Sequence, residues 1–124
     1  MRVMFVSSDK ELVQMLLGEQ LLPEKQLVIF NESREPLEVM SSVCINHPAV
    51  LILDDDFVKP NSVQILKSIR KINQTMKLVF ITSDTSIDLG RDISPLGIHY
   101  YGIKPLNDRA LGESIRSLIK VIEN

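Results

Sequence analysis

The stretch Ala49-Val50-Leu51-Ile52-Leu53-Asp54-Asp55-Asp56-Phe57 decides the fold of this 124-residue chain. Five apolar residues without polar alternation are typical of a strand that is covered on both faces, as in a parallel sheet. Three consecutive carboxylates follow at the point where that strand would end. A second apolar run, residues 78–81, ends in the same way at two hydroxyl residues, Thr82 and Ser83.

Apolar runs and helix-periodic segments alternate along the rest of the chain. Strands are predicted at residues 3–6, 27–30, 49–53, 78–81 and 99–103. Five helices are predicted between and after these strands. The first follows a Ser8-x-x-Glu11 capping box, the second starts near Pro36 and ends before Pro48, and the third covers residues 63–72. The fourth, within Thr85 to Leu96, is expected to be short or mobile, and the last is capped by Asn107 or Asp108. Five strand-helix units in succession favour an α/β fold with a parallel sheet and helices on both faces.

Parallel sheets of this kind bind ligands outside the carboxyl ends of their strands. In this chain four segments lie at those ends, which are residues 7–9, 54–56, 82–84 and 101–105. They supply carboxylates, hydroxyls and the ammonium of Lys104. Because phosphoryl transfer depends on positioning and on charge neutralisation, these groups indicate a phosphoryl-transfer site at this edge.

The composition is that of a globular domain and excludes several classes of function. Apolar residues make up 44% and charged residues 24%, and 124 residues suit one domain, which we place over residues 1–124. The net charge, 14 − 16 = −2, argues against a nucleic acid or an anionic membrane as partner. The five glycines form neither a dinucleotide fingerprint nor a P-loop.

The single cysteine and the N-terminus bear on where the chain resides. With only Cys44 no intrachain disulfide can form. We expect this small side chain to face the core from the inner face of its helix. The apolar run at residues 3–6 is too short for a signal peptide or a membrane span. We therefore expect a cytoplasmic protein.

The whole chain resembles the receiver domain of two-component response regulators. The residues that carry the resemblance are Asp54 after the third strand, Thr82 after the fourth and Lys104-Pro105 after the fifth, with Tyr101 three residues before the lysine; Ile69-Arg70 and Gly97 also fall in the family pattern. The resemblance implies a flavodoxin-like (βα)5 sandwich with strand order 2-1-3-4-5. It also implies phosphorelay signalling rather than enzymatic turnover of a metabolite.

The resemblance further implies a role for each matched residue. Asp54 would accept a phosphoryl group from a sensor histidine kinase or another signalling protein. Lys104 and Thr82 would contact phosphoryl oxygens, and Tyr101 would turn inward as Thr82 moves. Asp56 and Asp84 stand where family members tune the lifetime of the phosphoryl group, and the Lys104-Pro105 bond is expected to be cis.

One departure from the family pattern weakens the expected metal site. Receiver domains carry two adjacent acids after the first strand, and these positions are Ser7 and Ser8 here. Mg²⁺ prefers oxygen ligands that include carboxylates, so we expect Mg²⁺ to bind weakly or not at all. The remaining candidate ligands are Asp54, the backbone carbonyl of Asp56 and the side chain of Asp9.

Three alternatives stay open at this point. The chain is a phosphate-accepting receiver, a pseudo-receiver that binds a protein without phosphate, or an unrelated flavodoxin-like enzyme. A weak homodimer through Thr85 to Leu96 and the last helix is a further alternative.

Overall fold

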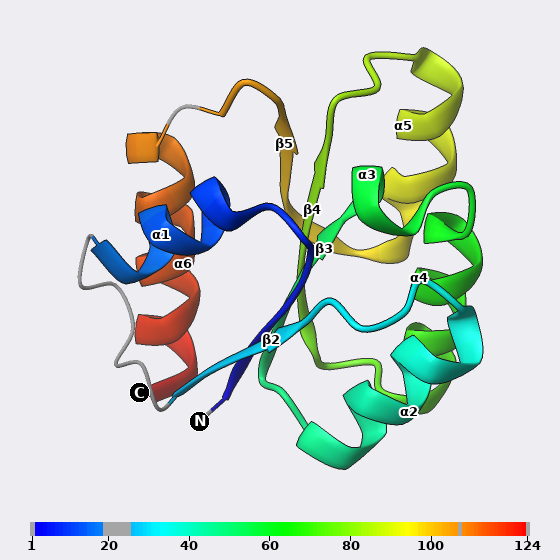
Figure 1. The fold of residues 1–124 in the computed structure, drawn as a ribbon, viewed down its shortest axis with the longest axis horizontal. Coiled ribbons are helices and arrows are strands. Elements are labelled where there is room, and N and C mark those ends of the chain that lie inside the picture. The colour runs from blue at the N-terminus through cyan, green and yellow to red at the C-terminus, as the bar shows by residue number, and fades with distance from the viewer. Residues whose placement is uncertain (1, 19–25, 107, 124) are drawn as a thin grey trace.

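A parallel sheet of five strands in the order β2-β1-β3-β4-β5 forms the middle layer (Figure 1). The computed structural model describes residues 2–18, 26–106 and 108–123. The strands are β1 Val3–Val6, β2 Leu27–Phe30, β3 Val50–Asp54, β4 Lys77–Thr82 and β5 Ile98–Ile103. The flavodoxin-like α/β fold with its 2-1-3-4-5 order is thereby confirmed.

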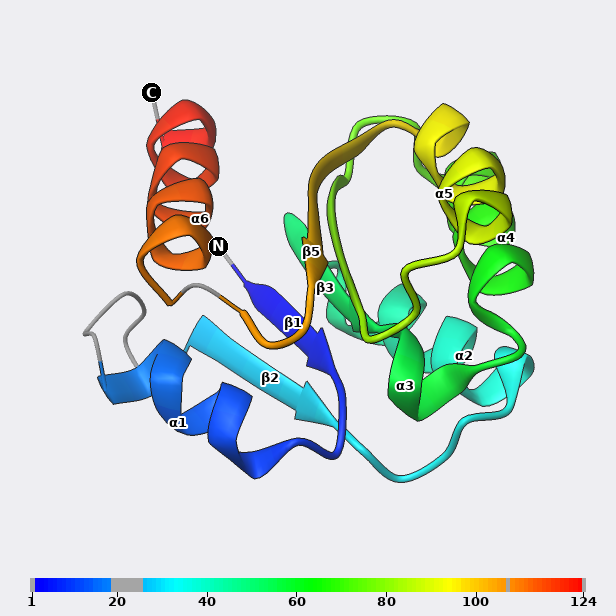
Figure 2. The same ribbon diagram turned by 90° about the horizontal axis from the view of Figure 1, so that it is seen from above.

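Helices cover both faces of the sheet. They are α1 Lys10–Gly18, α2 Pro36–Asn46, α3 Asp55–Val58, α4 Ser62–Ile72, α5 Ile87–Ile93 and α6 Asp108–Glu123, with a 3₁₀ turn at Ser94–Leu96. Figures 1 and 2 show α1 and α6 on one face and the other four helices on the opposite face. The helix expected within residues 85–96 is short, as predicted, whereas the single turn α3 was not predicted.

The pleat of the strands divides the core into two parts. Successive side chains of a strand point to opposite faces of the sheet. Val3 and Phe5 therefore pack toward α1 and α6, together with Leu111 of α6. Met4 and Val6 pack on the other face with residues of α2, α4 and α5. Both faces of the central strands are buried, which explains their unbroken apolar sequence.

The start of α1 differs from the predicted capping box. Oδ1 of Asp9, not the hydroxyl of Ser8, accepts the backbone N–H groups of Glu11 and Leu12, at 3.1 and 3.2 Å. Ser8 is exposed. The reason is that Ser7 still belongs to the sheet, since its N–H donates to the carbonyl of Phe30. The chain turns into the helix one residue later than the spacing indicated.

Cys44 is exposed, so the prediction that it faces the core was wrong. The buried stripe of α2 runs through Val39 and Val43, and the residue after Val43 is turned about 100° away from that stripe. Ile72, at the end of α4, is 57% exposed, although it continues the apolar spacing of that helix. Asn107, one of the two expected caps of α6, lies outside the described residues.

Candidate functional site

The register of the sheet brings the predicted site residues to one edge. Val6 pairs with Leu53, so the next residues of these strands, Ser7 and Asp54, lie side by side. The hydroxyl of Ser7 donates to Oδ2 of Asp54 at 2.7 Å. Ser7, which stands where the family pattern has an acid, is therefore a direct partner of the predicted phosphoryl acceptor.

Asp54 closes β3 and begins α3. Its Oδ1 accepts the N–H of Asp56 at 3.1 Å, which caps the single turn of helix. The ammonium of Lys104 lies 3.0 Å from Oδ1 and 3.2 Å from Oδ2. With the Ser7 hydroxyl on Oδ2, both oxygens carry two partners, and only 3% of the side chain is exposed. The carboxylate of Asp54 is therefore buried and hydrogen-bonded rather than solvated.

Lys104 joins three carboxylates at this edge. Besides Asp54 it contacts Oδ2 of Asp56 at 3.1 Å and Oδ2 of Asp9 at 3.5 Å. The peptide bond from Lys104 to Pro105 is cis, as the resemblance implied. The sheet places the lysine here because its N–H donates to the carbonyl of Thr82 at 2.8 Å. The predicted residues Asp9, Asp54, Asp56 and Lys104 thus form one ionic cluster.

The electrostatics of this cluster reflect burial opposed by close charge. Burial lowers the pKa of Lys104, but hydrogen bonds to Asp54 and Asp56 and their negative charges outweigh it, so the pKa is raised. Burial raises the pKa of Asp56, but the Ser83 hydroxyl and Lys104 outweigh it, so that pKa is lowered. At neutral pH the lysine and Asp56 are therefore an ion pair.

Thr82 lies at the same edge, but its hydroxyl is bonded to the neighbouring carboxylate, that of Asp55. Its hydroxyl donates to Oδ2 of Asp55 at 2.7 Å and accepts the N–H of Asp84 at 2.9 Å. Asp54 pairs with Ile81, so Thr82 is level with Asp55 at the ends of the two strands and within reach of its carboxylate. The family pattern places Thr82 with Asp54, whereas in this structure it is bonded to the next carboxylate.

Asp55 is the residue that sequence reasoning missed. It is 4% exposed, and its second oxygen accepts the hydroxyl of Ser62, the first residue of α4. The signal was present in the strand alternation, because Asp55 continues the face of Leu51 and Leu53, and Thr82 continues the face of Phe80. No separate role within the segment 54–56 was predicted for Asp55 from the sequence.

Two further predicted residues surround Thr82. The ring of Tyr101 packs against Phe80 with ring centroids 5.2 Å apart. Burial, followed by the charges of Asp55 and Asp84, raises the pKa of the Tyr101 hydroxyl. The carboxylate of Asp84 accepts the N–H of Ser86 and is exposed. Tyr101 thus lies on the face of Thr82 and Asp55, opposite the face of Lys104.

The acids at this edge are gathered around the ammonium of Lys104. Within residues 2–18, 26–106 and 108–123 there is no group of three or more His, Cys, Asp and Glu side chains able to hold a metal. The ammonium of Lys104 lies at the point that Asp9, Asp54 and Asp56 share. The Ser7 hydroxyl is used twice, since it also accepts the N–H of Asp9 at 2.9 Å. Metal ligation by Asp9 or Asp56 stays a prediction.

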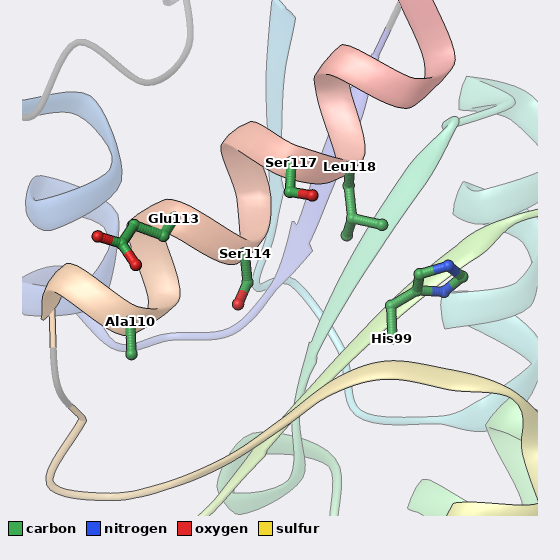
Figure 3. A pocket seen from close by; sticks show the side chains of 6 residues that line it. All are labelled: His99, Ala110, Glu113, Ser114, Ser117 and Leu118. Carbon is green, nitrogen blue, oxygen red and sulfur yellow. The ribbon is translucent and has the colours of Figure 1, made fainter.

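A pocket of about 400 Å³ lies elsewhere, between α6 and the edge strand β5 (Figure 3). Its lining residues are His99, Ala110, Glu113, Ser114, Ser117 and Leu118. Burial, and then the positive charges of Lys77 and Arg70, lower the pKa of His99. None of the residues that meet at Asp54 lines this pocket, so we do not assign the chemistry of the site to it.

Known proteins share this architecture. No family model matches the chain. The transcriptional regulatory protein CpxR of Escherichia coli K12 is 25% identical over 121 residues, which are 96% of this chain and 49% of CpxR. The chain thus spans about half the length of the curated relatives it matches.

Solved structures agree with this distant similarity. The signal receiver domain of a DNA-binding response regulator from Colwellia psychrerythraea superimposes with a TM-score of 0.77 at 24% identity, over 96% of this chain and 98% of that one. A two-component response regulator from Clostridium difficile gives 0.76 at 20% identity, over 99% and 98%. The chain has the fold of a response regulator receiver domain. In its described part, no helix combines the length and the apolar character needed to cross a bilayer.

Proposed function

We propose that residues 1–124 form a single receiver domain of two-component signalling, in which Asp54 accepts a phosphoryl group. The observation that carries the proposal is the contact of one ammonium, that of Lys104, with both oxygens of Asp54. A cation at this place neutralises the carboxylate at rest and can neutralise phosphoryl oxygens after transfer. The partner that supplies the phosphoryl group would be a sensor histidine kinase.

The proposed chemistry is a displacement at phosphorus. One oxygen of Asp54 attacks the phosphorus of the donor, and the bond from phosphorus to the donor breaks. The electron pair of that bond leaves with the donor, which takes up a proton. Lys104 holds the charge of the transferred group, while Ser7 and the N–H of Asp56 keep the carboxylate in place.

The test is an intact-mass measurement after incubation with a small phosphodonor such as acetyl phosphate. We expect one added phosphoryl group on the wild-type chain and none on Asp54→Asn, which has the same shape. Each sample is measured with and without Mg²⁺. If wild type and Asp54→Asn behave alike under both conditions, Asp54 is not the acceptor.

A second function is favoured by the enclosure of Asp54. Its side chain is 3% exposed and its Oδ2 already accepts the Ser7 hydroxyl, so an incoming donor has to displace a partner. We therefore keep the alternative of a pseudo-receiver that binds a protein partner without phosphate. Its contact surface would include Thr85 to Leu96, where Ile87 is 76% exposed.

A binding comparison separates the two functions. A pseudo-receiver would bind the same partner with equal affinity as wild type and as Asp54→Asn, whereas Ile87→Ser would weaken the complex. The same substitution tests a weak homodimer through this segment and α6, by sedimentation equilibrium at high protein concentration. An affinity that rises only after phosphorylation would contradict the pseudo-receiver.

A further inference from the structure

The pair Asp55 and Thr82 is a buried contact that the proposed phosphoryl chemistry does not use. Thr82 is 0% exposed and Asp55 is 4% exposed. The Thr82 hydroxyl has one hydrogen, and it donates that hydrogen to Oδ2 of Asp55. Its oxygen accepts the N–H of Asp84. A hydroxyl has one donor and two acceptor positions, so Thr82 has no donor left for a group on Asp54.

Asp55 is itself held firmly in this position. Its other oxygen accepts the hydroxyl of Ser62 on α4, and its backbone begins α3 directly after Asp54. A buried acceptor that loses its donor is costly. Thr82 can therefore turn toward Asp54 only if Asp55 gives up one of its two hydroxyl partners.

The neighbouring carboxylate holds the same loop from the other side. Oδ1 of Asp56 accepts the Ser83 hydroxyl at 2.7 Å. Two successive acids, Asp55 and Asp56, thus hold two successive hydroxyl residues at the end of β4. This pairing fixes the start of the loop from β4 to α5 relative to α3.

We propose that Asp55 is a positioning residue that holds the Thr82 hydroxyl away from Asp54 and so opposes phosphoryl transfer. The proposal rests on the proposed function, because it assigns Asp55 a role in the same reaction. Asp55 acts through Thr82 and does not touch the reacting atoms. Its removal releases the hydroxyl, which then becomes a donor for a phosphoryl oxygen.

The first experiment needs no phosphorylation. Asp55→Leu keeps the branching and the number of side-chain heavy atoms but has no acceptor. Asp55→Asn keeps the shape but offers one accepting oxygen to two hydroxyl donors. By NMR we expect Thr82 to keep one side-chain rotamer in the wild type and to populate others in Asp55→Leu. The amide of Asp84 should exchange about tenfold faster, because its acceptor moves. Asp55→Asn should change the Thr82 rotamers and the exchange of the Asp84 amide in the same direction but by less. If Asp55→Leu does not fold, Asp55→Asn takes its place in the experiment.

Ser62→Ala is the matched control. It removes the other hydroxyl from Asp55 and leaves the contact of Asp55 with Thr82 in place. We expect the rotamer of Thr82 and the exchange of the Asp84 amide to stay as in the wild type. If Thr82 keeps its rotamer in both Asp55 variants, the proposal is overturned, whatever Asp54 does.

The second experiment measures the rate of phosphorylation by acetyl phosphate. Asp55→Leu should raise this rate about tenfold, the effect of one hydrogen bond to a charged group. In a Thr82→Val background the same substitution should change nothing, because the hydroxyl through which Asp55 acts is gone. An equal change in both backgrounds would show a structural effect and would overturn the proposal.

The two failures are distinguishable. If no variant takes up a phosphoryl group, the proposed function fails, and the Thr82 rotamer alone then decides whether Asp55 holds the hydroxyl. If the wild type is inert and Asp55→Leu is phosphorylated on Asp54, the role of Asp55 is supported, whereas the proposed function of the wild-type chain fails.

Discussion

Three identical side chains in a row have three different environments. Asp54 binds Lys104 and Ser7, Asp55 binds Thr82 and Ser62, and Asp56 binds Lys104 and Ser83. These partners come from α4, from β4 and from the residues that follow β1, β4 and β5. The cause is local: the strand pleat separates Asp54 from Asp55, and the start of α3 turns Asp56 back toward the edge. The residue type alone therefore says little about the role of each aspartate.

The charge of Lys104 should control the titration of Asp56. We expect Lys104→Met to raise the pKa of Asp56, because it removes a hydrogen bond and a positive charge while burial remains. The wild-type pKa lies below the ordinary 3.8, so the stability that Asp56 contributes is present above that pH and is lost as the pH falls through the folded value. In Lys104→Met this acid-dependent loss should shrink.

The measurement is a carbon-detected NMR titration of the Asp56 carboxyl in both chains. Lys59→Met is the control, since Lys59 is 3.7 Å from Asp56 and its side chain is 61% exposed. Solvent screens so exposed a pair, and we expect a much smaller change. An equal rise in both variants would mean that Lys104 has no special influence on Asp56.

At the scale of elements, the first helix depends on one residue. Asp9→Ala should lower the free energy of unfolding by about 0.5–2 kcal/mol, the usual loss for a helix cap. Asp9→Asn should retain most of that stability, because it keeps the accepting oxygen while losing the charge that faces Lys104. Ser8→Ala, next in sequence and exposed, should be close to neutral. Urea unfolding of the four chains checks this, and a larger loss in Ser8→Ala than in Asp9→Ala would restore the capping box.

Long apolar runs were the predictable part of the elements. Strands β1 and β2 have the predicted bounds, and β3 to β5 differ by one residue at an end or at both. Features that depend on the exact residue at which the chain leaves a strand were not predictable, such as the Asp9 cap and the turn α3. Gly97, singled out in the sequence, adopts a φ of 77°, and an added Cβ there would lie 3.3 Å from the guanidinium of Arg70. Glycine at that position is thus explained by backbone and space together.

At the scale of the whole molecule, one sheet joins two cores. The chain contains two tyrosines and no tryptophan, and each tyrosine packs against a different core. Tyr101→Phe leaves Tyr100 to report the α1 and α6 side, and Tyr100→Phe leaves Tyr101 to report the other side. Because all five strands contribute to both cores, we expect the two variants to show coincident fluorescence and circular dichroism transitions in urea. Midpoints that differ between probes within one variant would contradict a single cooperative domain.

The sequence predicted the fold and the members of the site better than the site's internal contacts. Alternating strands and helices were enough for the sheet and its two helical layers. The convergence of Asp54, Thr82 and Lys104 at one edge follows from that sheet. Which carboxylate bonds Thr82 depended on register, and a shift of one residue moves a side chain to the other face. For that reason the roles of Asp54 and Asp55 had to come from the structure.

The most direct test of phosphoryl acceptance by Asp54 is to map the modified residue among Asp54, Asp55 and Asp56. After incubation with acetyl phosphate, borohydride reduction converts an aspartyl phosphate to homoserine, which peptide mass spectrometry can locate. We expect homoserine at residue 54 alone, because Lys104 contacts both carboxylate oxygens of Asp54. Homoserine at residue 55 or 56 in the wild-type chain would contradict it.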